Sequence, residues 1–249
     1  ESSRFGFSTL GSSLVAGEVR AEDLTNASDV QGAKLEDILA GLGIHRNNLL
    51  SLRRDPSSLK AYLELHIEQG PILEARRKPI GVVTSIAAPT RFKVIFTVQA
   101  HHPGSTTMDM RKDALVAAAE LTVAIEGICR QHSDMDKGRV VGTVGALKIE
   151  PGVINAVPGK AELAVDVRSI TASAKNRVVR LIEAKIREIA LRRKVRIKIL
   201  PIRKEDPVPL DKRVIHLLQD CCEAREIPYE IMPSGAGHDA MQMAKITPA

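Results

Sequence analysis

The sequence contains no tryptophan, and aromatic residues make up only 2% of it. It therefore offers few of the aromatic surfaces on which single-stranded nucleic acids stack. This scarcity argues against a nucleic-acid partner, although the net charge is +6 and the pI is near 9.3. The densest basic run, residues 192–198, alternates with apolar residues in its second half. We interpret it as the solvated face of a strand, although its positive field would also favour an anionic substrate.

Cysteine is scarce as well. Cys129, Cys221 and Cys222 show neither the spacing of a disulfide framework nor that of a Cys/His zinc cluster, so a reducing cytoplasm is the simplest expectation. The sequence has no apolar run long enough to cross a bilayer and no signal-peptide pattern, and we expect no membrane partner. It also lacks the nucleophile elbow of serine hydrolases and the glycine-rich phosphate loops of nucleotide-binding proteins.

The 249 residues, of which 44% are hydrophobic and 27% charged, are sufficient for one large globular domain or two smaller ones. Residues 82–200 show the periodicity β-β-α-β-β-α-β, which ends in the element order of a ferredoxin-like sandwich. Residues 1–81 and 201–249 are expected to form a second, discontinuous domain. Within its last part, Asp211 is a predicted N-cap for a helix over residues 211–225. The chain begins at Glu1 and not at methionine, so we interpret its start as a truncation.

Two histidine-containing motifs are candidates for metal binding. In LHIEQG, residues 65–70, an extended strand would place His66 on the same face as Glu64 and Glu68. Neutral imidazole suits zinc, manganese, cobalt or nickel, but spacing alone favours a histidine that is simply satisfied by a neighbouring glutamate. In SGAGHDA, residues 234–240, small residues before His238 let the backbone approach a ligand, although a glycine-rich turn that starts a helix explains them equally.

Two further motifs carry polar residues typical of substrate sites. His102 follows His101 in a loop and could stabilise an oxyanion, or the loop could be a plain polar connection. Asn155 lies in a predicted loop, and Arg168 lies at the end of the strand that follows. Arginine is the best side chain for bidentate capture of a carboxylate, but a local ion pair with Asp166 on the same strand face is the alternative.

Taken together, these motifs resemble those of the dimetal amidohydrolases, the family of N-carbamoyl-L-amino acid hydrolases, β-ureidopropionases and allantoate amidohydrolases. The resemblance extends in order through ESSRFG, LHIEQGP, GSTTMDMRKDAL, NAVPGKAELAVDVRS and SGAGHDA. It implies an α/β protein whose metallo-aminopeptidase-like catalytic domain, residues 1–81 and 201–249, is discontinuous and incomplete here. It also implies that residues 82–200 are an inserted ferredoxin-like α+β lid and dimerisation domain.

The resemblance also implies a role for each matching residue. A pair of divalent ions, of zinc, manganese, cobalt or nickel, would be held by His66 on one side and by Glu1 and His238 on the other. Gln69 would lie close to the substrate, and His102 would act as a catalytic residue that stabilises the oxyanion. Asn155 and Arg168 would bind the substrate carboxylate, and the lid domains would form a homodimer.

The sequence departs from the family pattern in several places. The family's first histidine ligand, bridging aspartate and catalytic glutamate correspond to positions before Glu1, so a molecule made of this chain alone is expected to be inactive. Pro103 and Thr107 replace a usual alanine and proline in the His102 loop, and Ser2 replaces a glycine. Pro103 restricts the backbone of His102, which puts the shape of the oxyanion loop in question.

The function implied is hydrolysis of N-carbamoyl-L-amino acids to the amino acid, CO2 and ammonia. The alternatives are hydrolysis of allantoate or another ureido acid, and an aminopeptidase or dipeptidase activity of the same superfamily. A further alternative is a catalytically inactive dimerisation or binding fragment.

Overall fold

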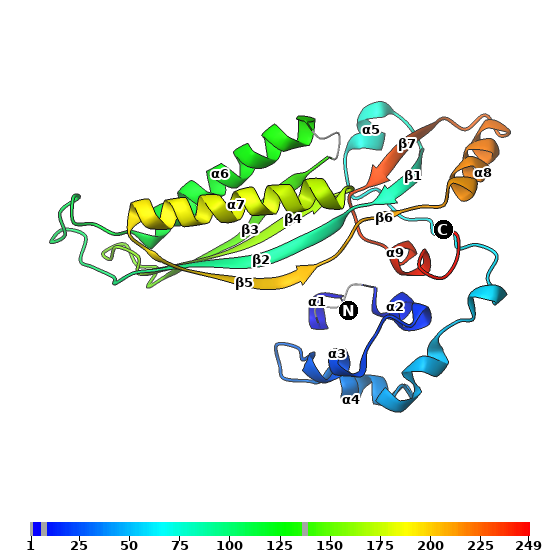
Figure 1. Ribbon diagram of the computed structural model, residues 1–249, viewed down its shortest axis with the longest axis horizontal. Helices are drawn as coiled ribbons and strands as arrows, with labels where there is room; N and C mark the ends of the chain where they lie inside the picture. Colours follow the sequence, from blue (N-terminus) through cyan, green and yellow to red (C-terminus); the bar gives the residue numbers. More distant parts are fainter. Residues whose placement is uncertain (1, 6–8, 136–138) are drawn as a thin grey trace. The chain divides into compact units, whose positions relative to one another are not determined.

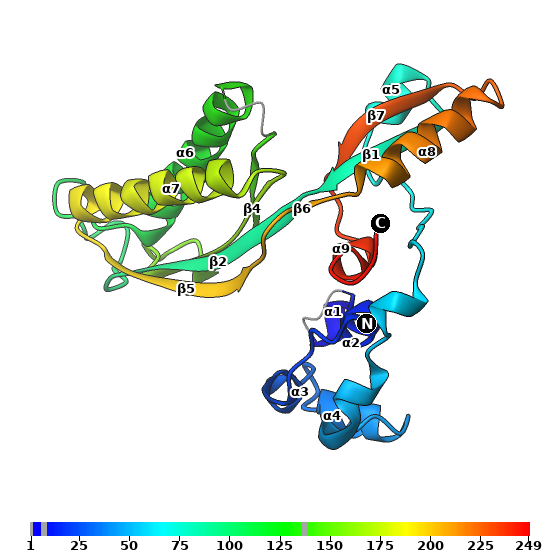
Figure 2. The same ribbon diagram turned by 45° about the vertical axis from the view of Figure 1, so that its right-hand side comes forward.

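The computed structural model describes residues 2–5, 9–135 and 139–249, and these residues divide into two units (Figures 1 and 2). Unit 1 comprises Glu1–Ile86 and Val208–Ala249, and unit 2 comprises Ala87–Pro207. The chain passes from unit 1 to unit 2 and back again. Unit 2 is therefore an insertion within unit 1.

Unit 2 contains one sheet and two long helices. In chain order its elements are β2 (Ala88–Thr97), α6 (Ala114–Met135), β3 (Val141–Glu150), β4 (Lys160–Ser169), α7 (Ala172–Arg193) and β5 (Arg196–Lys204). The strands are antiparallel in the order β3-β4-β2-β5, and both helices cover the same face of the sheet (Figure 1). The β-α-β-β-α-β order expected from the sequence is confirmed.

The core of unit 2 follows from the two periodicities in its sequence. Phe92, Val94 and Phe96 alternate along β2 and are all buried against the helices. The stripe of α7 that meets them repeats at helical spacing and is also buried; it consists of Val178, Ile182, Ile186 and Ile189. The other residues of each strand therefore point to the face of the sheet that no helix covers, where the polar side chains lie.

Unit 1 combines a small sheet with short helices. Its helices are α1 (Ser2–Phe5), α2 (Leu10–Ala16), α3 (Ala21–Asn26), α4 (Leu35–Ala40), α5 (Ile72–Arg76), α8 (Lys212–Glu223) and α9 (Ala240–Met243), with 3-10 turns η1 (Arg46–Leu52) and η2 (Pro56–Ser58). The sheet has the order β6 (Val208–Pro209), β1 (Ile80–Ile86), β7 (Tyr229–Ser234). As predicted, Asp211 caps α8, with its side chain accepting a hydrogen bond from the backbone N–H of Arg213. Among the described residues, no helix is both long and apolar enough to cross a membrane.

The alternating segment around His66 does not form a strand. Leu63, Leu65 and Ile67 are 60%, 96% and 75% exposed, and residues 61–69 have no regular secondary structure. Alternation of apolar and polar residues indicates an extended chain with two different faces, but a strand also needs a hydrogen-bonded partner. No described strand pairs with this segment. The expectation of a strand here was therefore wrong.

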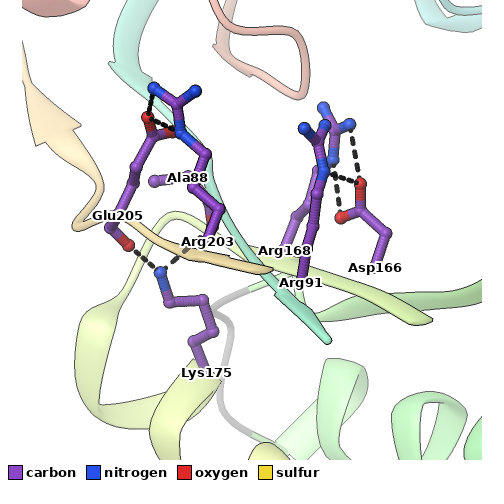
Figure 3. Close-up of polar contacts among 7 residues, drawn as sticks. All are labelled: Ala88, Arg91, Asp166, Arg168, Lys175, Arg203 and Glu205. Carbon is purple, nitrogen blue, oxygen red and sulfur yellow. Dashed lines mark hydrogen bonds and ion pairs between the residues drawn. The ribbon is translucent and has the colours of Figure 1, made fainter. Parts of the chain in front are cut away.

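A buried lysine forms hydrogen bonds to both ends of unit 2. The Lys175 ammonium donates hydrogen bonds to the carbonyl oxygen of Ala88, at 3.2 Å, and to that of Glu205 (Figure 3). Ala88 is the first residue of β2, and Glu205 follows the last residue of β5. Burial lowers the pKa of Lys175. Lys175 thus satisfies two backbone carbonyls at the point where both strands leave unit 2.

The basic run 192–198 divides into two parts in the structure. Arg192 and Arg193, at the end of α7, both form ion pairs with Glu120 on α6. The hydrogen bond from Arg193, assisted by that from Arg192, lowers the pKa of Glu120 to about 2 despite the opposing effect of burial. This triad joins the two helices of unit 2. Lys194 and Arg196 take no part in it.

We expect Glu120→Gln to destabilise the protein by about 1 kcal/mol at pH 7, because the paired groups are partly exposed and solvent screens them. The folded-state pKa lies below the ordinary value of 4.5, so the ion pair stabilises the fold above pH 4.5. Its contribution is lost as the pH falls from 4.5 towards 2. Urea unfolding at several pH values should show the variant and the parent protein converging in this window. Glu126→Gln, which removes an exposed pair with Arg130, is the control and should have a smaller effect. A difference that is independent of pH would contradict this account.

Candidate functional site

Two histidines distant in the sequence lie together in unit 1. The imidazole rings of His66 and His238 are stacked, with their centroids 4.7 Å apart and an interplanar angle of 27°. His66 belongs to the extended segment before α5, and His238 belongs to the turn between β7 and α9. The small residues of SGAGHDA form this turn. The structure therefore brings together two of the three predicted metal ligands.

Hydrogen bonds to both rings, and the burial of one of them, bear on their ability to bind a metal ion. Nδ1 of His66 lies 2.6 Å from the carbonyl oxygen of Ile67, so a proton on Nδ1 leaves the Nε2 lone pair for a ligand. Nε2 of His238 lies 2.7 Å from Oγ of Ser234. Burial, together with the neighbouring His66, lowers the pKa of His238. Neutral imidazole is the form that binds metal ions.

The nearby carboxylates bind backbone groups and do not pair with His66. Glu64 accepts a hydrogen bond from the N–H of Ala240 at 2.8 Å. Glu68 accepts from the N–H groups of Ile72 and Leu73 and so caps α5. The interpretation of His66 as a residue satisfied by a neighbouring glutamate is therefore not what the structure shows. These carboxylates fix the backbone on either side of the two imidazoles.

The paired imidazoles fit a divalent ion of the zinc, manganese, cobalt or nickel type, all of which accept nitrogen ligands. A complete coordination shell needs further donors. Within the described ranges, no group of three or more histidine, cysteine, aspartate or glutamate side chains converges. Glu1, the other predicted ligand, lies outside the described residues.

Gln69 follows His66 closely, is exposed and has a positive φ of 53°. Its predicted contact with substrate remains a prediction.

The loop that carries His102 lies at one end of unit 2 and is braced by its own side chains. Oγ of Ser105 lies 3.2 Å from Nδ1 of His102, and the hydroxyl of Thr106 donates to the carbonyl of His102. Arg111 donates to the carbonyl oxygens of Pro103 and Thr106. The imidazole of His102 is exposed. A preformed, exposed histidine of this kind can donate a hydrogen bond to a ligand that docks against the loop.

Arg168 lies on the face of the sheet that the helices leave uncovered. Its Nε and Nη2 donate to the two carboxylate oxygens of Asp166 at 3.0 Å, and Nε of Arg91 donates to the same carboxylate at 2.8 Å (Figure 3). Burial raises the pKa of Asp166, but Arg168 and Arg91 together lower it below its ordinary value. Arg91 was not predicted as a site residue from the sequence, although its position between Thr90 and Phe92 on β2 places it on the polar face, opposite to that of Phe92.

Arg168 and Asn155 lie at opposite ends of β4. Asn155 precedes the strand in an exposed turn, and the bridge between His101 and Val157 holds that turn next to the His102 loop. Lys160 is the first residue of β4 and Arg168 is the last but one, and the eight residue steps between them span roughly 26 Å. One copy of unit 2 therefore groups His102 with Asn155 and keeps Arg168 apart from both.

Comparison with known proteins shows the same similarity over nearly the whole chain. The family model for peptidase family M20/M25/M40 matches residues 22–249. The chain is 42% identical over 250 residues to an uncharacterized hydrolase of Haemophilus influenzae and covers 59% of that protein. It is 39% identical over 254 residues to a ureidoglycolate hydrolase of Arabidopsis thaliana, covering 53% of it. It is 37% identical over 248 residues to an N-carbamoyl-L-amino-acid amidohydrolase of a Pseudomonas species, covering 59% of it. In each case 99% or 100% of this chain is matched.

Solved structures agree with these sequence relatives. AtUAH in complex with glyoxylate superposes with a TM-score of 0.83 at 37% identity, over 100% of this chain and 59% of that one. An amidase of the hydantoinase/carbamoylase family from Burkholderia multivorans gives a TM-score of 0.84 at 30% identity, over 100% of this chain and 58% of that one. The chain thus spans somewhat more than half the length of the proteins that it matches.

Proposed function

The chain belongs to peptidase family M20/M25/M40, and on this basis we propose that the whole protein hydrolyses a C–N bond of a small ureido acid with the help of divalent metal ions. The first candidate substrate is an N-carbamoyl-L-amino acid, which would yield the amino acid, CO2 and ammonia. The stacked pair of His66 and His238 is the observation that carries this proposal. Support comes from the relatives, which include amidohydrolases of N-carbamoyl-L-amino acids and of allantoate.

His66 and His238 would hold metal through their imidazole nitrogens. Divalent ions at such a site lower the pKa of a bound water from 15.7 to about 7 and polarise the carbonyl to be attacked. His102 would donate a hydrogen bond to the substrate carbonyl oxygen as negative charge develops there. Arg168 would bind the substrate carboxylate through its planar guanidinium, and Asn155 would add an amide donor. Gln69 would contact the substrate beside His66.

The two ends of unit 2 support a homodimer. A substrate of a few ångströms cannot touch both Arg168 and Asn155 of one copy of unit 2, because they lie at opposite ends of β4, whose residues Lys160 and Arg168 are roughly 26 Å apart. If both residues contact one substrate, one of the two must come from a second copy of the chain. The edge strand β3 exposes Val141, Leu147 and Ile149, and this apolar edge is a suitable surface for that second copy.

Ureidoglycolate is the second candidate substrate. It is favoured by the 39% identity to the ureidoglycolate hydrolase of Arabidopsis thaliana and by the match to AtUAH in complex with glyoxylate. Both candidates carry a ureido group close to a carboxylate, so Arg168 and the histidine pair would serve either one. The side group next to the carboxylate distinguishes them, a hydroxyl in one and an amino-acid side chain in the other.

The test is a hydrolysis assay of the whole protein reconstituted with zinc, manganese, cobalt or nickel, which follows ammonia release from ureido acids and amino-acid release from dipeptides. Its substrates are N-carbamoyl-L-amino acids, ureidoglycolate, allantoate and a set of dipeptides. We expect a ureido acid to be hydrolysed with a kcat/KM at least about 100-fold above that of any dipeptide, because a site that hydrogen-bonds the ureido group rejects substrates that leave its polar groups unpaired. Chelation should abolish the activity, and added metal should restore it. Faster hydrolysis of dipeptides would establish the peptidase alternative, and no turnover of any substrate would leave a binding protein.

A further inference from the structure

A cavity of about 490 Å³ lies at the end of unit 2, where the start of β5 meets the His102 loop. It is lined by the last residues of β2, by the loop from His101 to Lys112, by Lys194 after α7 and by Arg196 on β5. All of these residues belong to unit 2. A volume of this order suits a small molecule and is larger than a single water needs.

The cavity is strongly positive. Lys112, Lys194 and Arg196 all line it, and none of the three forms an ion pair with a carboxylate in the described part of the chain. In contrast, the neighbouring Arg192 and Arg193 are both paired with Glu120. Uncompensated charges that converge on a concave surface raise the local concentration of anions.

The carboxylates of the adjoining segments are already engaged. Asp113, next to Lys112, accepts hydrogen bonds from the N–H groups of Leu115 and Val116 and so caps α6. Asp109 accepts a hydrogen bond from the hydroxyl of Thr107, which lowers the pKa of that carboxyl. Neither carboxylate forms an ion pair with Lys112, Lys194 or Arg196.

The neutral lining adds hydrogen-bonding groups. Ser105 and Thr106 line the cavity, and their hydroxyls contact the ring and the carbonyl of His102. An anion in the cavity would therefore touch the same loop that positions His102. Hydroxyl groups and cationic side chains are the usual partners of phosphate and carboxylate oxygens.

We propose that this cavity binds a small, multiply charged oxyanion, either a phosphate or a polycarboxylate, through Lys112, Lys194 and Arg196. This inference goes beyond the proposed hydrolysis, because the anion site needs neither substrate nor metal. The alternative is a solvated basic surface whose cations act only through their summed field.

Calorimetric titration of the protein with inorganic phosphate and with citrate tests the proposal, at constant ionic strength set by chloride and without metal or substrate. We expect saturable binding of at least one of these anions. Whichever anion binds identifies the source of the oxyanion groups. Arg196→Met and Lys112→Met should each weaken this binding by about tenfold or more, as expected for the loss of a charge-assisted hydrogen bond.

Lys198→Met is the matched control, because Lys198 is exposed, lies two residues after Arg196 on the same face of β5, and does not line the cavity. It should change the affinity less than about twofold, as a screened surface charge does. Equal weakening by Lys198→Met and Arg196→Met would overturn the proposal in favour of a diffuse basic surface. Absence of saturable binding of either anion would overturn it as well. Arg196 and Lys112 are both exposed, so the two variants should fold normally, and thermal unfolding checks this.

Discussion

Replacing His238 with alanine is expected to reduce the hydrolytic rate by at least about 100-fold and to lower the metal content of the purified protein. Loss of a residue that only orients a metal ligand costs about 10- to 100-fold in affinity or activity, so loss of a direct ligand should cost at least as much. His238 is suited to this role because it is buried, lies against His66 and has a lowered pKa. His66→Ala should have an effect of similar size. Elemental analysis and the ammonia-release assay measure both quantities.

The control for these variants is His216→Ala. His216 is exposed on α8 in the same unit, so its loss removes a histidine without affecting the stacked pair. Because His238 is buried, His238→Gln should be compared with His238→Ala to separate loss of a ligand from loss of packing. If metal content and activity survive in His238→Gln and His66→Ala, the two imidazoles are a structural contact and the metal site lies elsewhere.

Periodicity alone predicted most of unit 2. The stripe of Val178, Ile182 and Ile186 on α7, and the alternation of Phe92 and Val94 on β2, each report which side of an element is buried. These signals are local, because the spacing of apolar residues within one helix or strand shows which of its faces must be buried. The capping of α8 by Asp211 is local too, since the carboxylate binds an N–H only two residues away.

Contacts between distant residues could not be read from such patterns. The alternation at Leu63, Leu65 and Ile67 indicated a strand, but a ladder depends on a partner that this local sequence does not specify. The contact between His66 and His238 is likewise long-range, and only the resemblance to a known family indicated that both serve one site. Spacing alone favoured a structural role for His66.

The polar face of unit 2 shows a further limit. Asp166 and Arg168 were recognised as neighbours on one strand, because side chains two residues apart share a face. Arg91 lies next to them because the register of β2 with β4 pairs Arg91 with Asp166. This register cannot be deduced from the local sequence of either strand. The same register places Arg168 beside Pro89 and so far from the Asn155 end of the sheet. Strand pairing therefore decided which of the predicted substrate residues lie together.

Arg168→Met is expected to lower kcat/KM for a ureido acid by about 10- to 100-fold, mainly through KM. A hydrogen bond to a charged group is worth about 1.5–3 kcal/mol, and each 1.4 kcal/mol is a factor of ten. Arg168→Lys should recover only part of the loss, because an ammonium keeps the charge but not the planar pair of donors. Asp166 retains its hydrogen bond from Arg91 in both variants, so the sheet should remain intact.

The decisive comparison is between a ureido acid and the corresponding carboxamide, which lacks the negative charge. If Arg168 binds the substrate carboxylate, its removal should penalise the acid and leave kcat/KM for the amide nearly unchanged. If Arg168 serves only its ion pair with Asp166, both substrates should be affected alike. Arg203→Met is the matched control, because Arg203 lies on β5, two strands from Arg168, and its ion pair is with Glu205 and not with Asp166. Carboxylate recognition would be assigned to Arg168 itself if Arg168→Met lowers kcat/KM for the acid alone and Arg203→Met does not. A general change in the charge of the sheet would lower kcat/KM for the acid in both variants.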